Sequence, residues 1–223
     1  MDYRIKCSPR RIRPALSVSG GVVTLHLPEI YPADLPDKLI ASNRLLIEQM
    51  LQKERMRAAP FEPDFRIGAL FPMQGKMYPV TPGAGKMPEF AGDGFQVTTS
   101  APLLLRRQMR QIYFNRAAEV ISRKAYILAT RNHLRYSELK FNSAETRWGS
   151  CTGGGVINFS WKLVLCADEL IEYVVAHELA HLRQMNHSAQ FWQEVGNIFP
   201  SYRERRAELR REGERYRRFN LPL

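Results

Sequence analysis

The sequence predicts an α+β protein in which a small antiparallel or mixed sheet packs on helices. Two kinds of pattern carry this prediction. Apolar residues recur at helical spacing in three segments, residues 35–57, 103–131 and 169–185. Short runs rich in β-branched residues lie between them, at residues 15–27, 138–142 and 156–165. With 223 residues, of which 44% are hydrophobic and 25% charged, the chain can bury a core without disulfide support.

The first hundred residues predict a hairpin, a helix and a region of short strands. Residues 15–27 alternate loosely around Gly20-Gly21, which is typical of a β-hairpin with a glycine turn. Residues 35–57 form an amphipathic pattern that Pro60 closes. Residues 60–102 contain seven of the 14 prolines and six of the 14 glycines, so we expect short strands there, such as 65–71 and 76–80, joined by loops.

The remainder predicts longer elements. Residues 103–131 lack Pro and Gly and interleave apolar with basic side chains, which indicates a long basic helix. Residues 138–142 and 156–165 predict strands, and Asp168 is a candidate cap for the apolar helix that follows. The C-terminal run opens with a capping-box pattern from Ser201 to Glu204, and its high charge predicts a solvated helix.

The net charge is the unusual feature of the composition. Lys and Arg number 33 against 22 Asp and Glu, so the formal charge is +11. The excess is +7 in residues 101–150 (10 basic, 3 acidic) and +4 in residues 201–223 (8 basic, 4 acidic). Residues 151–200 are net −3 (2 basic, 5 acidic). A basic balance suits nucleotides or nucleic acid, here through segments 101–135 and 203–218.

Cysteine usage and hydropathy indicate a cytoplasmic protein. The three cysteines are an odd number and form no C-x-x-C pair, which argues against a disulfide framework. The first 18 residues contain no continuous apolar stretch, and no window offers about 18 uncharged apolar residues. We therefore expect neither export by a standard signal nor a membrane partner.

The predicted helix at residues 169–185 carries the arrangement His177-Glu178-Leu179-Ala180-His181. At about 100° per residue, the two histidines lie about 40° apart on one face and can share a metal ion. Glu178 lies about 100° from His177, where a carboxylate can face a metal-bound water. Three ionisable groups on an apolar helix are costly unless they are paired or bind a metal. This H-E-x-x-H pattern predicts a zincin-type helix with Zn²⁺ as cofactor.

A tetrahedral site needs a third protein ligand, and His187 follows His177 by ten positions. For His187 to reach the same metal, the helix must end near Met185 and turn, with Asn186 as a candidate for a left-handed turn residue. Ser188 is then placed to cap the next helix. Glu194 and Glu204 are the alternative third ligands.

Several motifs around this helix resemble those of the YgjP-like metallopeptidase family, which is related to SprT-like and gluzincin-type zinc proteases. They are Arg147-Trp148-Gly149-Ser150-Cys151, Ile157-Asn158, Trp161, Leu163, the run from Tyr173 to Leu182, Asn186-His187-Ser188 and Phe191-Trp192. The resemblance implies zinc at His177, His181 and His187, Glu178 as catalytic acid/base, and a strand edge near 156–165 beside the active-site helix. The Pro/Gly-rich stretch 81–101 resembles an insertion, and the Arg-rich tail also departs from the pattern.

We therefore expect residues 1–100 to form an N-terminal region and residues 101–223 a zinc metallopeptidase-like core, joined in one compact unit. The first hypothesis for function is a zinc-dependent peptidase acting on peptides or unfolded proteins, in which Glu178 is the general base for a zinc-activated water. We expect the peptide to bind in extended form along the edge of the 156–165 strand. Arg147, Tyr173 or an arginine of the tail would stabilise the developing oxyanion. The alternatives are a zinc-dependent nucleotide phosphohydrolase (pyrophosphatase) and a nucleic-acid-associated SprT-like protein. The sequence leaves the substrate and the oligomeric state undecided.

Overall fold

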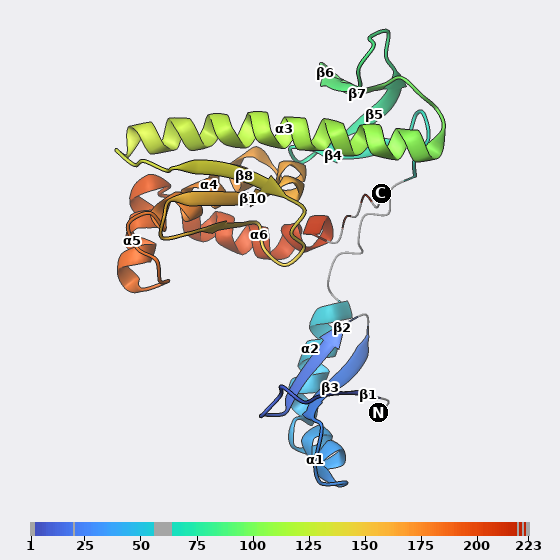
Figure 1. Cartoon of the computed structure of the whole chain (residues 1–223), viewed down its shortest axis with the longest axis vertical. Coiled ribbons are helices and arrows are strands. Elements are labelled where there is room, and N and C mark those ends of the chain that lie inside the picture. The colour runs from blue at the N-terminus through green and yellow to red at the C-terminus, as the bar shows by residue number, and fades with distance from the viewer. Residues whose placement is uncertain (1–2, 20, 56–63, 218, 220, 222–223) are drawn as a thin grey trace. The chain divides into compact units, whose positions relative to one another are not determined.

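The structure is a computed structural model that describes residues 3–19, 21–55, 64–217, 219 and 221 (Figure 1). Its contacts divide the chain into two compact units, Met1–Ala58 and Ala59–Leu223. The boundary thus lies before the Pro/Gly-rich region, whose strands share a core with the long helix of the second unit. In both units small sheets pack on helices, so the predicted mixed α+β class is confirmed.

The first unit contains a three-stranded sheet in the order β1-β3-β2. Its strands are β1 (Tyr3–Ser8), β2 (Ala15–Ser19) and β3 (Val22–Pro28). The predicted hairpin is confirmed, because β2 and β3 pair antiparallel and Gly21 has a φ of 76°. β3 is central, and its alternate residues Val23, Leu25 and Leu27 are buried. This alternation places one face of the hairpin in the core of the unit.

Two helices follow the sheet where the sequence predicted one helix over residues 35–57. They are α1 (Leu35–Ser42) and α2 (Arg44–Arg55); residues 56 and 57 lie outside the described residues. The helix is interrupted at Asn43, where φ is −114° and ψ is 16°. Both the backbone N–H and the side-chain amide of Asn43 donate to the carbonyl of Leu39. This local competition for a helical carbonyl is typical of asparagine and explains the break.

The second unit begins with a four-stranded sheet in the order β4-β5-β7-β6. Its strands are β4 (Leu70–Met73), β5 (Lys76–Pro82), β6 (Glu89–Ala91) and β7 (Gly94–Val97). The strand predicted at 65–71 begins only at Leu70, because Gly68 adopts a φ of 85° in a preceding turn. The strand predicted at 76–80 is confirmed and extends to Pro82.

The predicted long helix is confirmed as α3 (Pro102–Arg131), a 30-residue element that spans the second unit in Figure 1. One side of α3 is buried along its length, from Leu105 to Ala129. Its basic side chains lie mainly outside this buried stripe. Within the described part of the chain, none of the helices is both long enough and apolar enough to cross a membrane.

A second, three-stranded sheet of this unit has the order β8-β10-β9. Its strands are β8 (Glu138–Asn142), β9 (Gly149–Cys151) and β10 (Val156–Ser160). The strand predicted at 156–165 ends at Ser160 and continues as the 3-10 helix η1 (Trp161–Leu165). All five residues of η1 are buried. Successive side chains of a strand point to opposite faces, whereas η1 is enclosed by the core on every side. The sequence prediction therefore made this strand five residues too long.

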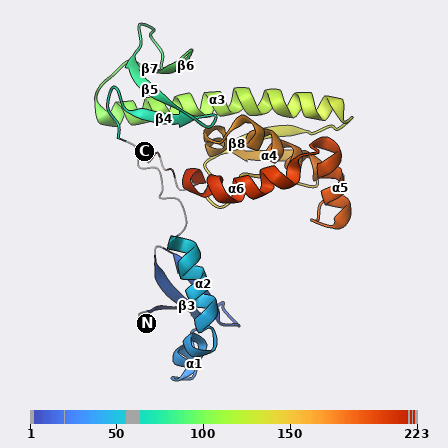
Figure 2. The ribbon, with the colours of Figure 1, turned by 180° about the vertical axis from the view of Figure 1, so that it is seen from behind.

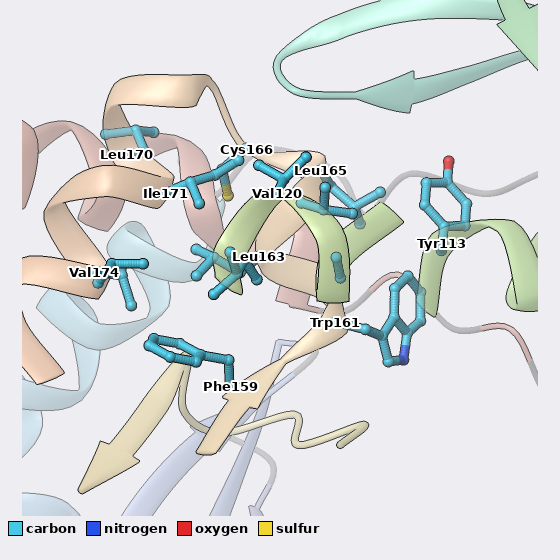
Figure 3. Packing of buried hydrophobic residues seen from close by; sticks show 14 of the residues in the cluster. Tyr113, Val120, Phe159, Trp161, Leu163, Leu165, Cys166, Leu170, Ile171 and Val174 are labelled. Carbon is cyan, nitrogen blue, oxygen red and sulfur yellow. The ribbon is translucent and has the colours of Figure 1, made fainter. Parts of the chain in front are cut away.

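Three helices complete the second unit: α4 (Asp168–Ala180), α5 (Ala189–Ile198) and α6 (Tyr202–Arg217). Helix α4 contacts α3, β9, η1, α5 and α6, so it lies at the centre of this unit. Figure 2 shows α6 running beside α4. Figure 3 shows the adjoining core, where Val120 of α3, Phe159 of β10, Leu163 of η1 and Ile171 of α4 pack together. This packing gives α4 a rigid support.

Candidate metal centre

Helix α4 is fixed to α3 by ion pairs at its first turns. Lys124 Nζ of α3 lies 2.6 Å from Asp168 Oδ2 and 3.0 Å from Glu172 Oε2. Asp168 is the first residue of the helix and Ala167 is its N-cap, so the expectation that Asp168 caps the helix is wrong. The Asp168 carboxylate instead lies in the first turn, where the helix dipole favours negative charge.

The helix predicted to reach residue 185 ends at Ala180, and His181 is its C-cap. The backbone N–H groups of Leu182 and Arg183 then donate to the carbonyls of Leu179 and Ala180, which tightens the chain into a turn. Asn186 has no positive φ, so the expectation of a left-handed turn there is wrong. The tight turns after Ala180 already change the direction of the backbone, so the chain needs no residue in the left-handed conformation to bring His187 back.

Two contacts hold this turn in place. Arg183 donates to Glu194 Oε2 and to the carbonyl of Asn132, each at 2.9 Å. As predicted, Ser188 caps α5, and its Oγ accepts the backbone N–H of Phe191 at 3.3 Å. His187, immediately before this cap, is thereby brought back to His177 and His181.

The three histidines converge on one point. Their ligand nitrogens all lie within 4.8 Å of one another, and the Nε2 atoms of His177 and His187 are 3.2 Å apart. Two ligands of a tetrahedral zinc ion, each at 2.0–2.1 Å, are separated by about 3.3 Å, so this spacing fits. His181 Nδ1 donates to the carbonyl of Gln184 at 3.0 Å, which leaves Nε2 for a metal. Neither Glu194 nor Glu204 belongs to this group, and Glu194 pairs with Arg183.

Burial keeps the imidazoles of His177 and His181 neutral, as metal binding requires. Burial, together with the neighbouring His181, His187 and Arg206, lowers the pKa of His177 to about 3. Burial also lowers the pKa of His181. Phe191 stacks on His181 with ring centroids 4.4 Å apart, so α5 restrains the ring that it faces. The three-histidine donor set, with His177 and His181 neutral, therefore fits a zinc ion.

Glu178 lies on the same helix and has only 4% of its surface exposed. Its Oε2 atom is buried and has no hydrogen-bond partner among the described residues. Burial raises the pKa of Glu178 to about 8, against the opposing effect of the Arg147 guanidinium. A buried carboxyl oxygen without a partner is costly, so packing alone does not account for this residue.

Gly149 lies against Glu178, a contact that the sequence did not predict, although Gly149 lies within one of the quoted motifs. A Cβ atom at this position would lie 2.6 Å from Cγ and 2.7 Å from Oε1 of Glu178. Strand β9 therefore approaches the Glu178 carboxyl so closely that no side chain fits between them. The glycine at the start of β9 was the available signal, but Glu178, which it contacts, is 29 positions away in the sequence.

A cavity of about 590 Å³ opens beside His177, His187 and Glu178. All three kinds of predicted oxyanion donor line it: Arg147, Tyr173 and arginines of the tail. Burial raises the pKa of Tyr173 to about 12, so its hydroxyl keeps its proton at neutral pH. The other lining residues are Trp148, Gly149, Val174, His177, Glu178, His187, Trp192, Arg206, Leu209, Arg210 and Arg217.

The C-terminal helix thus contributes to the site, and the expectation of a merely solvated helix is corrected. Leu209 and Tyr216 of α6 pack against the hydrophobic core, and three of its arginines line the cavity. The sequence prediction missed this packing because it depends on contacts with distant segments. The few apolar residues of α6 share one side of the helix and pack against the region around α4. No residue of the other basic segment, 101–135, lines this cavity.

Two comparisons with known proteins found matches. The family model for the YgjP-like metallopeptidase domain matches residues 12–212, which is most of the chain. The chain therefore belongs to the YgjP-like metallopeptidase family. No curated protein matches. Among solved structures, the crystal structure of the metallopeptidase zymogen of Pyrococcus abyssi abylysin aligns at 22% identity, covering 42% of this chain and 90% of that chain, with a TM-score of 0.35.

Proposed function

We propose that the protein is a zinc metallopeptidase that hydrolyses peptide bonds, with His177, His181 and His187 as metal ligands and Glu178 as general base. One observation carries the proposal: three imidazoles converge beside a buried carboxyl group that has an oxygen without a hydrogen-bond partner among the described residues. Membership of a metallopeptidase family supports peptides as substrates. Neither the comparisons nor the described contacts support a nucleic-acid partner.

The residues divide the chemical work between them. A bound Zn²⁺ supplies a Lewis acid and lowers the pKa of water toward neutrality. A cation held by the three histidines would lower the pKa of Glu178 and favour its ionised form. The free oxygen of Glu178 would then accept a proton from the attacking water, and Glu178 would return it to the leaving amine. Arg147 and Tyr173 line the cavity as donors for the carbonyl oxygen on which negative charge develops. The protonated Tyr173 hydroxyl suits this role.

The strand order of the sheet shows that the strand expected to bind the peptide has no free edge. A peptide was expected along the edge of residues 156–165, but β10 is paired with β8 on one side and β9 on the other. The outer strand next to α4 is β9, whose first residue, Gly149, lines the cavity. We propose that an extended peptide, including a segment of an unfolded protein, adds to the outer edge of β9.

Nucleotide hydrolysis is the second candidate function, and the arginines that line the cavity favour it. Guanidinium groups bind phosphate oxygens as well as carboxylates, and Arg147, Arg206, Arg210 and Arg217 all line the same cavity as the histidines. The family assignment favours peptides. A substrate panel that contains denatured proteins, peptides and nucleoside triphosphates separates the two functions.

Metal removal tests the proposed centre. Purified protein is expected to bind one zinc ion per chain and to hydrolyse a denatured protein, and a chelator should stop hydrolysis. At a free zinc concentration a hundredfold above Kd, binding raises the free energy of unfolding by about 2.7 kcal/mol, which corresponds to a rise in Tm of roughly 5–11 °C. Metal analysis and thermal unfolding with and without zinc measure both effects.

Two histidine variants control this experiment. His187→Ala should lose the zinc-dependent rise in Tm, because a ligand is missing. His26→Ala removes a histidine of the first unit, whose Nε2 lies 2.8 Å from Ser17 Oγ, and should retain the rise. A wild-type protein that binds no zinc, or an unchanged response in His187→Ala, contradicts the proposed centre.

A further inference from the structure

We infer that the cavity selects substrates with a carboxylate close to the scissile bond, which is held by Arg206 and Arg210 of α6 together with Arg147. This inference rests on the proposed peptidase function and adds a substrate class to it. The carboxylate has two possible sources, an Asp or Glu side chain and the C-terminus of the peptide.

The placement of the arginines carries the inference. Arg206 and Arg210 are four residues apart on α6, so they lie on one face of the helix, and both line the cavity. The Arg206 guanidinium lies 4.1 Å from the ring centroid of Trp192, and that ring stacks on His187 with centroids 5.8 Å apart. The positive charges of Arg206 and Arg210 oppose the rise in the pKa of Tyr173, so both arginines lie near Tyr173 in the cavity.

The charge of the cavity is unbalanced. Glu178 is the one acidic residue among those that line it, against four arginines. Arg147, Arg206 and Arg210 form no ion pair with any carboxylate in the described part of the chain, whereas Arg205 and Arg211, which do not line the cavity, pair with Glu208 and Glu212. Glutamates thus neutralise arginines elsewhere on α6, while those at the cavity remain available. Guanidinium groups that share a cavity repel one another and attract an anion.

Contacts along α6 hold these arginines in position. At its start, Tyr202 stacks on Trp192 with ring centroids 5.7 Å apart at 15°. Near its end, Gly213 leaves room for Trp148, whose Cζ2 would lie 2.9 Å from a Cβ atom at that position. The buried Lys162 donates to the carbonyl of Arg217 at 2.9 Å. The backbone positions of the arginines are therefore fixed, which lowers the entropic cost of binding an anion.

The cavity favours a peptide over a nucleotide as the source of the anion. Trp148, Val174, Trp192 and Leu209 also line it, so apolar surface adjoins the guanidinium groups. A peptide supplies both an apolar side chain and a carboxylate, and the arginine fork matches a carboxylate with two parallel hydrogen bonds. The family assignment also points to a peptide.

The test compares quenched fluorescent peptides that differ only in Glu, Gln or Lys next to the scissile bond, each with a free or an amidated C-terminus. We expect kcat/KM to be about tenfold to a hundredfold higher for a peptide with the recognised carboxylate than for its neutral counterpart. A preference for Glu over Gln identifies a side chain as the source of the carboxylate. A preference for the free over the amidated C-terminus identifies the terminal carboxylate. The double variant Arg206→Gln, Arg210→Gln should abolish the preference, and Arg210→Glu should shift it toward Lys.

Arg211→Gln is the matched control, because it removes the same charge from the same helix at a side chain that is 70% exposed and does not line the cavity. It should retain the preference. Fluorescence anisotropy with Glu178→Gln provides a readout without turnover, in which the acidic peptide should bind more tightly and its affinity should fall with added salt.

Equal kcat/KM values and equal affinities for all peptides overturn the inference but leave the peptidase intact. Hydrolysis of no peptide by the wild type contradicts the proposed function, while the anisotropy experiment still decides the carboxylate preference. Hydrolysis of nucleoside triphosphates alone, in a manner that depends on Arg206 and Arg210, identifies phosphate as the ligand and overturns the inference.

Discussion

Replacement of Glu178 by Gln is expected to lower kcat for peptide hydrolysis by a factor of about 10²–10⁴ and to leave the zinc content unchanged. The amide fills the same buried space but does not accept the proton that the attacking water must lose. Glu178 does not belong to the group of three histidines, so the metal ligands are preserved. Steady-state kinetics and metal analysis of the same preparation measure both outcomes.

Glu169→Gln is the control for this variant. Glu169 lies in the first turn of the same helix and is exposed, so the substitution removes an equal charge away from the cavity. Its activity should match that of the wild type. An active Glu178→Gln protein would show that another group accepts the proton. A simultaneous loss of zinc would show that Glu178 supports the metal rather than the reaction alone.

Replacement of Gly149 by Ala is expected to lower kcat roughly a hundredfold, because displacement of a catalytic group by about 1 Å is sufficient for such a loss. The new methyl group would lie 2.6 Å from Glu178 Cγ, which is too close for any carbon contact. Strand β9 is paired with β10, where Gly149 lies opposite Phe159, so the Glu178 side chain must move instead. Kinetics, zinc content and Tm are the measurements.

Gly153→Ala is the matched control for the strand variant. Gly153 lies between β9 and β10, and a Cβ atom there would have no neighbour within 4 Å. Its activity and Tm should remain close to those of the wild type. Gly149→Ala should retain zinc, since the histidines come from other positions. Wild-type activity in Gly149→Ala would contradict a role for this glycine in placing the Glu178 carboxyl.

Sequence patterns predicted the local elements well where the periodicity was long or the turn residues were distinctive. The 30-residue helix α3, the hairpin around Gly21 and the cap of α5 at Ser188 are examples. Boundaries failed where packing decided them. Trp161–Leu165 reads as a strand in the sequence but is a buried 3-10 helix, and the helix that carries His181 ends five residues earlier than the pattern suggested.

The sequence by itself determined that His177, Glu178 and His181 share one turn of a helix, because helical geometry is local and follows from their spacing. Only the tertiary structure decided that β9 approaches Glu178 at Gly149 and that β10 has no free edge. It also decided where the positive charge acts. Along the chain, the arginines of residues 201–223 are separate from the acidic stretch that carries the histidines. Helix α6 brings them to the cavity because Trp148 fits against Gly213 and Lys162 binds the carbonyl of Arg217. Those contacts join residues more than 50 positions apart, and no local periodicity encodes them.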